Sequence, residues 1–237
     1  MKLIQRHGYI EFLRRNRERS IIKVVSGIRR CGKSTLFRLF KDELLAEGVK
    51  PEQIISINFE ELEYEPLREY HALYQYILNQ MQPNQMNYIF LDEIQHVDQF
   101  HRVVDSLFVK ENTDIYITGS NAYFMSSDIA TLLTGRYVEI QMLPLSFAEF
   151  YFSKYEEQQY SLIPAYEAYL RESSFPYTQQ LGGEDFDIQE YLRGLFNTLL
   201  LHDVVARLKI NDVMILQDIV RYIMANVGSL LSPNKIA

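Results

Sequence analysis

The sequence predicts an α/β protein in which helices cover both faces of a parallel sheet, followed by a smaller all-helical region. Between residues 21 and 142, short β-branched apolar runs alternate with amphipathic stretches spaced for helices. This alternation is the order that gives a doubly wound parallel sheet. After Pro144 only helix-like stretches remain. A chain of 237 residues is long enough for one such domain and a smaller appendage.

The first predicted strand and the helix after it enclose a glycine-rich loop. A short helix over residues 3–15 leads into a nearly continuous apolar run at 21–25, which is typical of a strand covered on both faces. The stretch after Ser34 is spaced for a helix that buries one side. The apolar residues on that side are Leu36, Phe37, Leu39, Phe40, Leu44 and Leu45.

The loop at residues 27–34 reads Gly-Ile-Arg-Arg-Cys-Gly-Lys-Ser, a complete phosphate-loop pattern. Because it leads into a helix N-terminus, its free amides can point at a phosphate. Lys33 is predicted to reach the outer phosphates and to act in catalysis, and the Ser34 hydroxyl suits Mg²⁺. A plain glycine turn capped by a lysine is the weaker alternative. The predicted nucleotide-binding residues of this loop are Gly27, Ile28, Arg29, Arg30, Cys31, Gly32, Lys33, Ser34 and Thr35.

A second apolar run, at residues 88–91, ends abruptly in Asp92 and Glu93. A buried parallel strand has this pattern, and ligands bind beyond the carboxyl ends of such strands. Asp92 is predicted to hold Mg²⁺ together with Ser34, as a Walker B aspartate does. Glu93 is predicted to orient, or take a proton from, the water that attacks the γ-phosphate. The alternative, a solvated turn, loses weight because a phosphate loop lies about sixty residues upstream.

Further elements complete the alternation. A strand at 54–59 and a helix at 67–81 lie between the two motifs, and a helix at 100–109 follows the acids. Two more strands are expected at 114–119 and 137–142.

Polar residues beside these last two strands are candidate catalytic or phosphate-sensing residues. Ser120 and Asn121 follow the strand at 114–119, where a P-loop ATPase often has a residue that senses the γ-phosphate or positions water. Turn residues bonded to their own backbone are an equal alternative. Arg136 precedes the strand at 137–142 and is a candidate to stabilise charge on a transferred phosphoryl group, in its own site or a neighbour's. The alternative is that Arg136 is an ordinary surface arginine or one paired with a carboxylate.

Five strings of residues occur in an order that resembles a known family. They are Gly27 to Thr35, Phe90 to Gln95, Ile117 to Asn121, Leu133 to Arg136, and Pro144 to Phe150. Together they resemble the prokaryotic AAA-type ATPases described as predicted ATP-binding proteins, related to the archaeal and signal-transduction ATPases. The resemblance covers nearly the whole chain, and the last three strings are the most selective.

The resemblance implies a five-stranded parallel AAA-type core, a helical region, a winged-helix segment and, in full-length members, a nuclease-like C-terminal domain. We therefore expect a P-loop ATPase core at residues 1–143, a helical lid at 144–211 and the start of a winged-helix segment at 212–237. Ser232 is a good N-cap and Pro233 a good first helical residue. This pattern suggests an N-terminal fragment of a longer protein.

The expected function is that of an ATP-binding, Mg²⁺-dependent ATPase that cycles between ATP and ADP as a nucleotide-driven switch. The choice of adenine rests on the resemblance alone. Two alternatives stay open: a regulatory module that binds nucleotide with negligible turnover, and a DNA-interacting ATPase whose contact would run through a part beyond Ala237. A P-loop kinase for a small metabolite is disfavoured because adjacent acids suit water activation. The sequence identifies neither a protein partner nor an oligomeric state.

The composition limits which classes of partner and which cellular compartment are expected. The net charge of −7 provides no electrostatic footprint for wrapping nucleic acid. No apolar stretch is long enough to predict a membrane span. The lone cysteine, Cys31, excludes internal disulfides and indicates a reducing cytoplasm. Because Cys31 lies near a helix N-terminus and beside two arginines, we expect a lowered thiol pKa. His96 and His101 lack the spacing of a metal pair on one helical face, so no separate zinc site is expected.

Overall fold

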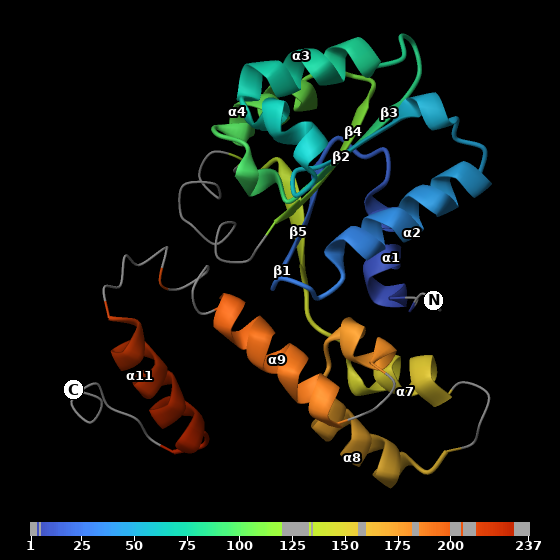
Figure 1. Ribbon diagram of the computed structural model, residues 1–237. Helices are drawn as coiled ribbons and strands as arrows, with labels where there is room; N and C mark the ends of the chain where they lie inside the picture. Colours follow the sequence, from blue (N-terminus) through green and yellow to red (C-terminus); the bar gives the residue numbers. More distant parts are fainter. Residues whose placement is uncertain are drawn as a thin grey trace. The chain divides into compact units, whose positions relative to one another are not determined.

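The computed structural model describes residues 4, 6–119, 133, 135–155, 160–181, 185–199, 205 and 212–229. The chain divides into two compact units, Met1–Gly183 and Glu184–Ala237. The strands belong to the first unit (Figure 1). None of the helices in the described part of the chain is long and apolar enough to cross a membrane.

Five parallel strands form one sheet in the order β2-β3-β4-β1-β5 (Figure 1). The strands are β1 (Ile22–Gly27), β2 (Ile54–Asn58), β3 (Asn87–Asp92), β4 (Thr113–Gly119) and β5 (Tyr137–Met142). Because all pairs are parallel, the carboxyl ends of the strands meet at one edge of the sheet. The predicted fold class, a five-stranded parallel α/β sheet with helices on both faces, is confirmed.

Helices cover both faces of this sheet. They are α1 (His7–Asn16), α2 (Lys33–Ala46), α3 (Tyr70–Gln80) and α4 (Phe100–Phe108). Ile22 and Val24 of β1 belong to one apolar cluster with residues of α3 and α4. Val25 belongs to a second cluster with residues of α1 and α2. Since side chains alternate between the faces of a strand, β1 is buried on both sides, as its continuous apolar run predicts.

Helices α7 (Phe147–Tyr155) and α8 (Leu162–Glu172) follow the sheet within the first unit and pack around Phe150, which is fully buried. The second unit contains α9 (Asp185–Leu199) and α11 (Val213–Ala225). Short 3₁₀ helices occupy Pro51–Gln53, Leu62–Arg68, Ile94–His96 and Pro176–Gln180.

The first compact unit ends at Gly183, whereas the sequence places its first domain boundary at 143/144. The helical lid and the winged-helix start therefore stay predictions. Residues 230–237, which include the expected start of a further helix, lie outside the described residues.

Candidate nucleotide site at the carboxyl edge of the sheet

The phosphate loop joins the carboxyl end of β1 to the first turn of α2. A Cβ on Gly27 would lie 2.4 Å from Met142 O and 3.0 Å from Cys31 Sγ, so the space admits only glycine. Gly32, directly before α2, has a φ of 107°, in the left-handed region that favours glycine. Both glycines of the pattern therefore have a backbone reason for their positions.

Helix α2 begins at Lys33, and its first helical hydrogen bond runs from Leu36 N to Gly32 O at 2.9 Å. The amides of Lys33, Ser34 and Thr35 precede that bond, so they have no carbonyl partner within the helix. The first turn also contains no acidic residue. A helix N-terminus in this state is suited to an anion such as a phosphate.

Lys33 and Glu93 form the centre of the site. Lys33 Nζ lies 3.0 Å from Glu93 Oε1, and the two side chains are 3% and 7% exposed. The same ammonium donates to Gly27 O at 3.2 Å and to Ile28 O at 3.4 Å. The structure thus brings together the cation of the phosphate loop and the second acid of the β3 end.

Glu93 is held as a carboxylate. Burial by itself would raise its pKa, but the charge of Lys33 and a hydrogen bond from Gln95 outweigh that effect and lower the pKa below its ordinary value. Glu93 also adopts a left-handed backbone conformation, with φ 54° and ψ 47°. Such strain in a residue other than glycine costs about 1–3 kcal/mol and is concentrated at functional sites.

Asp92, the last residue of β3, is buried and accepts a hydrogen bond from the Thr118 hydroxyl. Burial raises the pKa of Asp92, although hydrogen bonds from Ser34 and Thr118 oppose the rise. The Ser34 hydroxyl and the Asp92 carboxylate are therefore adjacent oxygen donors of the kind that Mg²⁺ prefers. The nearby charge of Lys33 lowers the pKa of Asp92 but does not outweigh burial, so a metal ion at this oxygen pair would supply the missing positive charge.

Thr118 fixes both acids at once, and the sequence did not single it out. Its hydroxyl donates to Asp92 and accepts the backbone N–H of Glu93 at 2.9 Å. Thr118 lies on β4, the strand next to β3 in the sheet. Its position at the carboxyl end of a predicted strand is the signal that could have identified it.

A second unanticipated residue, Arg6, anchors the back of the phosphate loop. Its side chain is 5% exposed and lies 2.6 Å from Glu149 of α7. It also donates to Cys31 O at 3.2 Å and to Leu143 O at 2.8 Å. One guanidinium thus links the loop, the end of β5 and the first helix after the sheet.

The expectation for Cys31 was wrong. Its side chain is fully buried. Burial raises the pKa of the thiol, and the nearby charges of Lys33 and Arg6 do not compensate. Desolvation therefore decides the state of this thiol, not the neighbouring cations that the sequence shows.

The structure does not bring Arg136 together with Lys33. Gly27 pairs with Met142 at one end of β5, whereas Ile22 pairs with Tyr137 at the other. At about 3.3 Å per residue, Arg136 lies on the order of 20 Å from the phosphate loop along the sheet. It forms an ion pair of 2.8 Å with Asp105 of α4. Ser120 and Asn121 lie outside the described residues.

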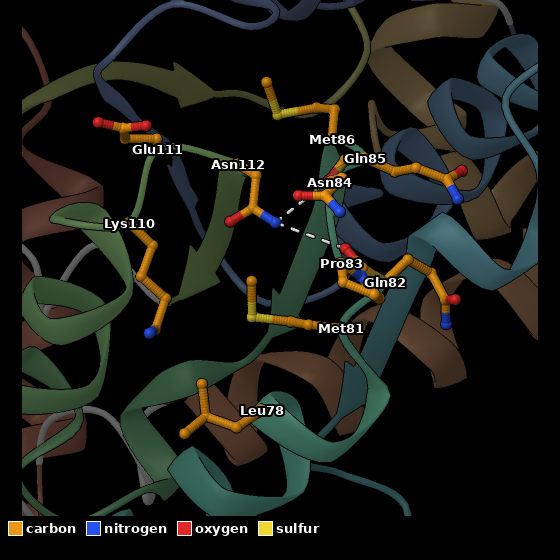
Figure 2. A pocket seen from close by; sticks show the side chains of 10 residues that line it. All are labelled: Leu78, Met81, Gln82, Pro83, Asn84, Gln85, Met86, Lys110, Glu111 and Asn112. Carbon is orange, nitrogen blue, oxygen red and sulfur yellow. Dashed lines mark hydrogen bonds between the residues drawn. The ribbon is translucent and has the colours of Figure 1, made fainter.

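A separate hollow of about 810 Å³ lies near the amino ends of β3 and β4 (Figure 2). It is lined by the segment 81–86 with Leu78 and by Lys110, Glu111 and Asn112. Asn112 Nδ2 donates to Gln85 O at 3.3 Å across it. Among the residues that the structure describes, none of those predicted for the nucleotide site lines this hollow, so it is distinct from the phosphate loop.

A parallel sheet with a phosphate loop after β1 and an acid pair after β3 defines a P-loop NTPase, and comparison with known proteins places it in a family. The AAA domain model matches residues 19–151, more than half of the chain. The chain belongs to the AAA domain family, and the resemblance inferred from the sequence strings is confirmed. Its parallel sheet and its phosphate-loop pattern are those of a P-loop NTPase.

Two relatives are uncharacterized proteins. One, from Haemophilus influenzae, is 38% identical over 238 residues, which cover 99% of this chain and 59% of the relative. The other, MJ1544 from Methanocaldococcus jannaschii, is 33% identical over 224 residues, which cover 86% of this chain and 47% of the relative. The chain thus spans about half the length of the curated relatives it matches.

Among solved structures, the Walker-type ATPase PABY2304 of Pyrococcus abyssi is similar with a TM-score of 0.58 at 16% sequence identity. The match covers 98% of this chain and 87% of that chain. The similarity shows a shared fold.

Proposed function

We propose that the protein binds ATP and hydrolyses it with Mg²⁺, and that it acts as a nucleotide-driven switch in the cytoplasm. The carrying observation is the 3.0 Å contact between Lys33 Nζ and Glu93 Oε1, directly beside Asp92. A phosphate-binding cation, a metal-binding acid and an ionised base then lie within one site. The choice of ATP over GTP rests on membership of the AAA domain family.

The roles follow from chemistry. The amides of residues 27–35 and Lys33 bind the phosphates. Ser34 and Asp92 would hold Mg²⁺, which would supply positive charge to neutralise the phosphates. Glu93 orients the attacking water and takes up its proton.

The Lys33–Glu93 pair also couples binding to chemistry. Without nucleotide, Lys33 neutralises Glu93 and keeps the carboxylate from accepting a proton. A bound triphosphate offers Lys33 a stronger anionic partner, so the ammonium moves to the phosphate and Glu93 becomes free for water. The base is thus active only when its substrate is present.

The switch would run through Arg6. Closure of the phosphate loop around a nucleotide moves the Cys31 carbonyl, to which Arg6 donates. Arg6 is also paired with Glu149 at the start of α7. A displacement of the loop is therefore passed to the helices that follow the sheet, the kind of local event that drives nucleotide switches.

The test is titration calorimetry with ATP, ADP and GTP, with and without Mg²⁺, together with phosphate release. Glu93→Gln keeps the shape of the side chain, so we expect ATP affinity to persist and turnover to fall by about 10²–10⁴. The matched control is Glu167→Gln, which changes an exposed acid on α8. Robust hydrolysis by Glu93→Gln would remove Glu93 from its role. Absence of nucleotide binding by the unmodified chain would remove the function.

A further inference from the structure

Two side chains with no role in the proposed nucleotide chemistry, Glu60 and His96, converge on the candidate base Glu93. Glu60, Glu93 and His96 each place one ligand atom so that all three atoms lie within 4.8 Å of one another. Glu60 follows β2, Glu93 follows β3, and His96 closes the 3₁₀ helix Ile94–His96. β2 and β3 are paired through Asn58 and Asp92, which explains why residues distant in sequence meet.

One ring nitrogen of His96, Nε2, is buried without a hydrogen bond within the described part of the chain. An unsatisfied buried polar atom costs about 1–3 kcal/mol, and each such atom in a native protein calls for an explanation. A ligand that accepts the nitrogen lone pair would supply the missing partner.

We infer that Glu60, Glu93 and His96 form a binding site for a zinc-class divalent cation. One imidazole nitrogen and two carboxylate oxygens are three protein ligands of the types that bind Zn²⁺, with the fourth tetrahedral position left to water. A nitrogen ligand favours Zn²⁺ over Mg²⁺, which prefers oxygen ligands. The trio therefore differs in metal preference from the all-oxygen pair Ser34 and Asp92.

Two cations that already pair with the carboxylates of the trio weaken the metal affinity that we expect. Arg29 Nη1 lies 3.8 Å from Glu60, and Lys33 lies 3.0 Å from Glu93. An arriving metal ion must displace Arg29 and share Glu93, so binding in the micromolar range is expected, not the tight binding of a structural zinc site. Each carboxylate oxygen has two lone pairs, so Glu93 can bind metal and still accept from Gln95.

Metal at this trio would regulate the site, and this consequence rests on the proposed function. Zn²⁺ on the Glu93 carboxylate makes it a weaker base for the attacking water, so micromolar Zn²⁺ inhibits ATP hydrolysis. Additional Mg²⁺ does not relieve this inhibition, because Mg²⁺ binds at Ser34 and Asp92.

The site is tested by titrating Zn²⁺ alone into tag-free protein without nucleotide. The unmodified chain is expected to bind one ion, and His96→Ala and Glu60→Gln each to bind at least about tenfold more weakly. His101→Ala is the matched control, because His101 lies on α4 outside the trio. No binding by the unmodified chain, or an affinity in both trio variants equal to that of the unmodified chain, would overturn the inference.

Two further measurements separate the possible failures. Thermal melts establish that each variant is folded, and Glu60→Gln changes an exposed side chain, so it remains informative if His96→Ala does not fold. ATP hydrolysis with and without Zn²⁺ is then compared with each variant's own metal-free rate. If the chain binds zinc through His96 but has no ATPase activity, the proposed function is refuted and the metal site is supported.

Discussion

Lys33 Nζ lies 3.0 Å from Glu93 Oε1, so the phosphate-binding cation and the candidate base neutralise each other in the nucleotide-free protein. Neither group is exposed enough for water to replace its partner. The ionisation of Glu93 and the orientation of both side chains therefore depend on this contact.

Lys33→Ala removes the cation from the loop and leaves Glu93 buried alone. We expect ATP affinity to fall about 100-fold or more, because charge-assisted hydrogen bonds to phosphate are lost. The pKa of Glu93 should rise, since burial then acts without the opposing charge. Titration calorimetry measures the affinity, with Lys50→Ala as the exposed control. ATP affinity like that of the control would show that Lys33 does not contact phosphate.

Thr118→Val keeps the shape of the side chain and removes the hydroxyl that joins the two acids. The Asp92 carboxylate and the Glu93 amide each lose a buried partner, so the free energy of unfolding should fall by about 1–3 kcal/mol. Turnover should fall as well, because the acids lose their alignment. Thr118→Ser restores the hydroxyl and should recover both properties. If the serine variant behaves like the valine variant, packing and not hydrogen bonding is what Thr118 provides.

Asp92→Asn should stabilise the nucleotide-free protein. Burial raises the pKa of Asp92, so the native state holds the carboxyl proton more tightly than the unfolded chain does. The free energy of unfolding then falls as pH rises from the ordinary aspartate pKa to the raised one, and the loss persists at neutral pH. The variant removes this cost, on the order of 1 kcal/mol.

Denaturant unfolding at neutral pH and below the ordinary aspartate pKa checks this sign, since the gain should vanish at the acidic end. Asp98→Asn, at an exposed position, should show no such gain. Asp92→Asn should also lose the thermal shift that ATP with Mg²⁺ gives. A variant less stable than the unmodified protein at neutral pH would contradict the argument.

Arg6→Met keeps an unbranched apolar stem but removes the guanidinium. The carbonyls of Cys31 and Leu143 lose a buried donor and Glu149 loses its ion partner. We expect a loss of about 2–4 kcal/mol in unfolding free energy and weaker nucleotide binding through a loosened loop. Arg15→Met, an exposed change on α1, is the control. Unchanged ATP affinity in a destabilised Arg6→Met variant would confine Arg6 to a structural role.

The sheet, the phosphate loop and the acid pair could be predicted because each corresponds to a pattern of consecutive residues in the sequence. Buried parallel strands read as apolar runs, and β1 and β3 end in glycine and in acid at the edge where ligands bind. The position of Thr118 at a predicted strand end was available from the sequence, but the contacts of Arg6, Thr118 and Glu60 could not be predicted this way. Their contacts depend on which strands become neighbours, and β4 lies between β1 and β3 only in the folded sheet.

Arg136 presents a final prediction, because its position excludes one of its two candidate roles. It sits before the amino end of β5, whereas the phosphate loop lies at the carboxyl edge, so it cannot reach its own nucleotide without rearrangement of the sheet. Any catalytic role requires the site of a second copy. Its ion pair with Asp105 is partly exposed and contributes at most about 1 kcal/mol, so Arg136→Ala should fold normally.

Hydrolysis per protomer, measured over a dilution series, distinguishes the outcomes. If copies associate, the rate of the unmodified chain rises with concentration, and Arg136→Ala should lose that rise. Asp105→Asn breaks the same ion pair but keeps the guanidinium, so it should retain the concentration dependence. Equal loss in both variants would assign the effect to the ion pair. A rate in Arg136→Ala that is reduced equally at every concentration would contradict the placement of Arg136 outside its own site.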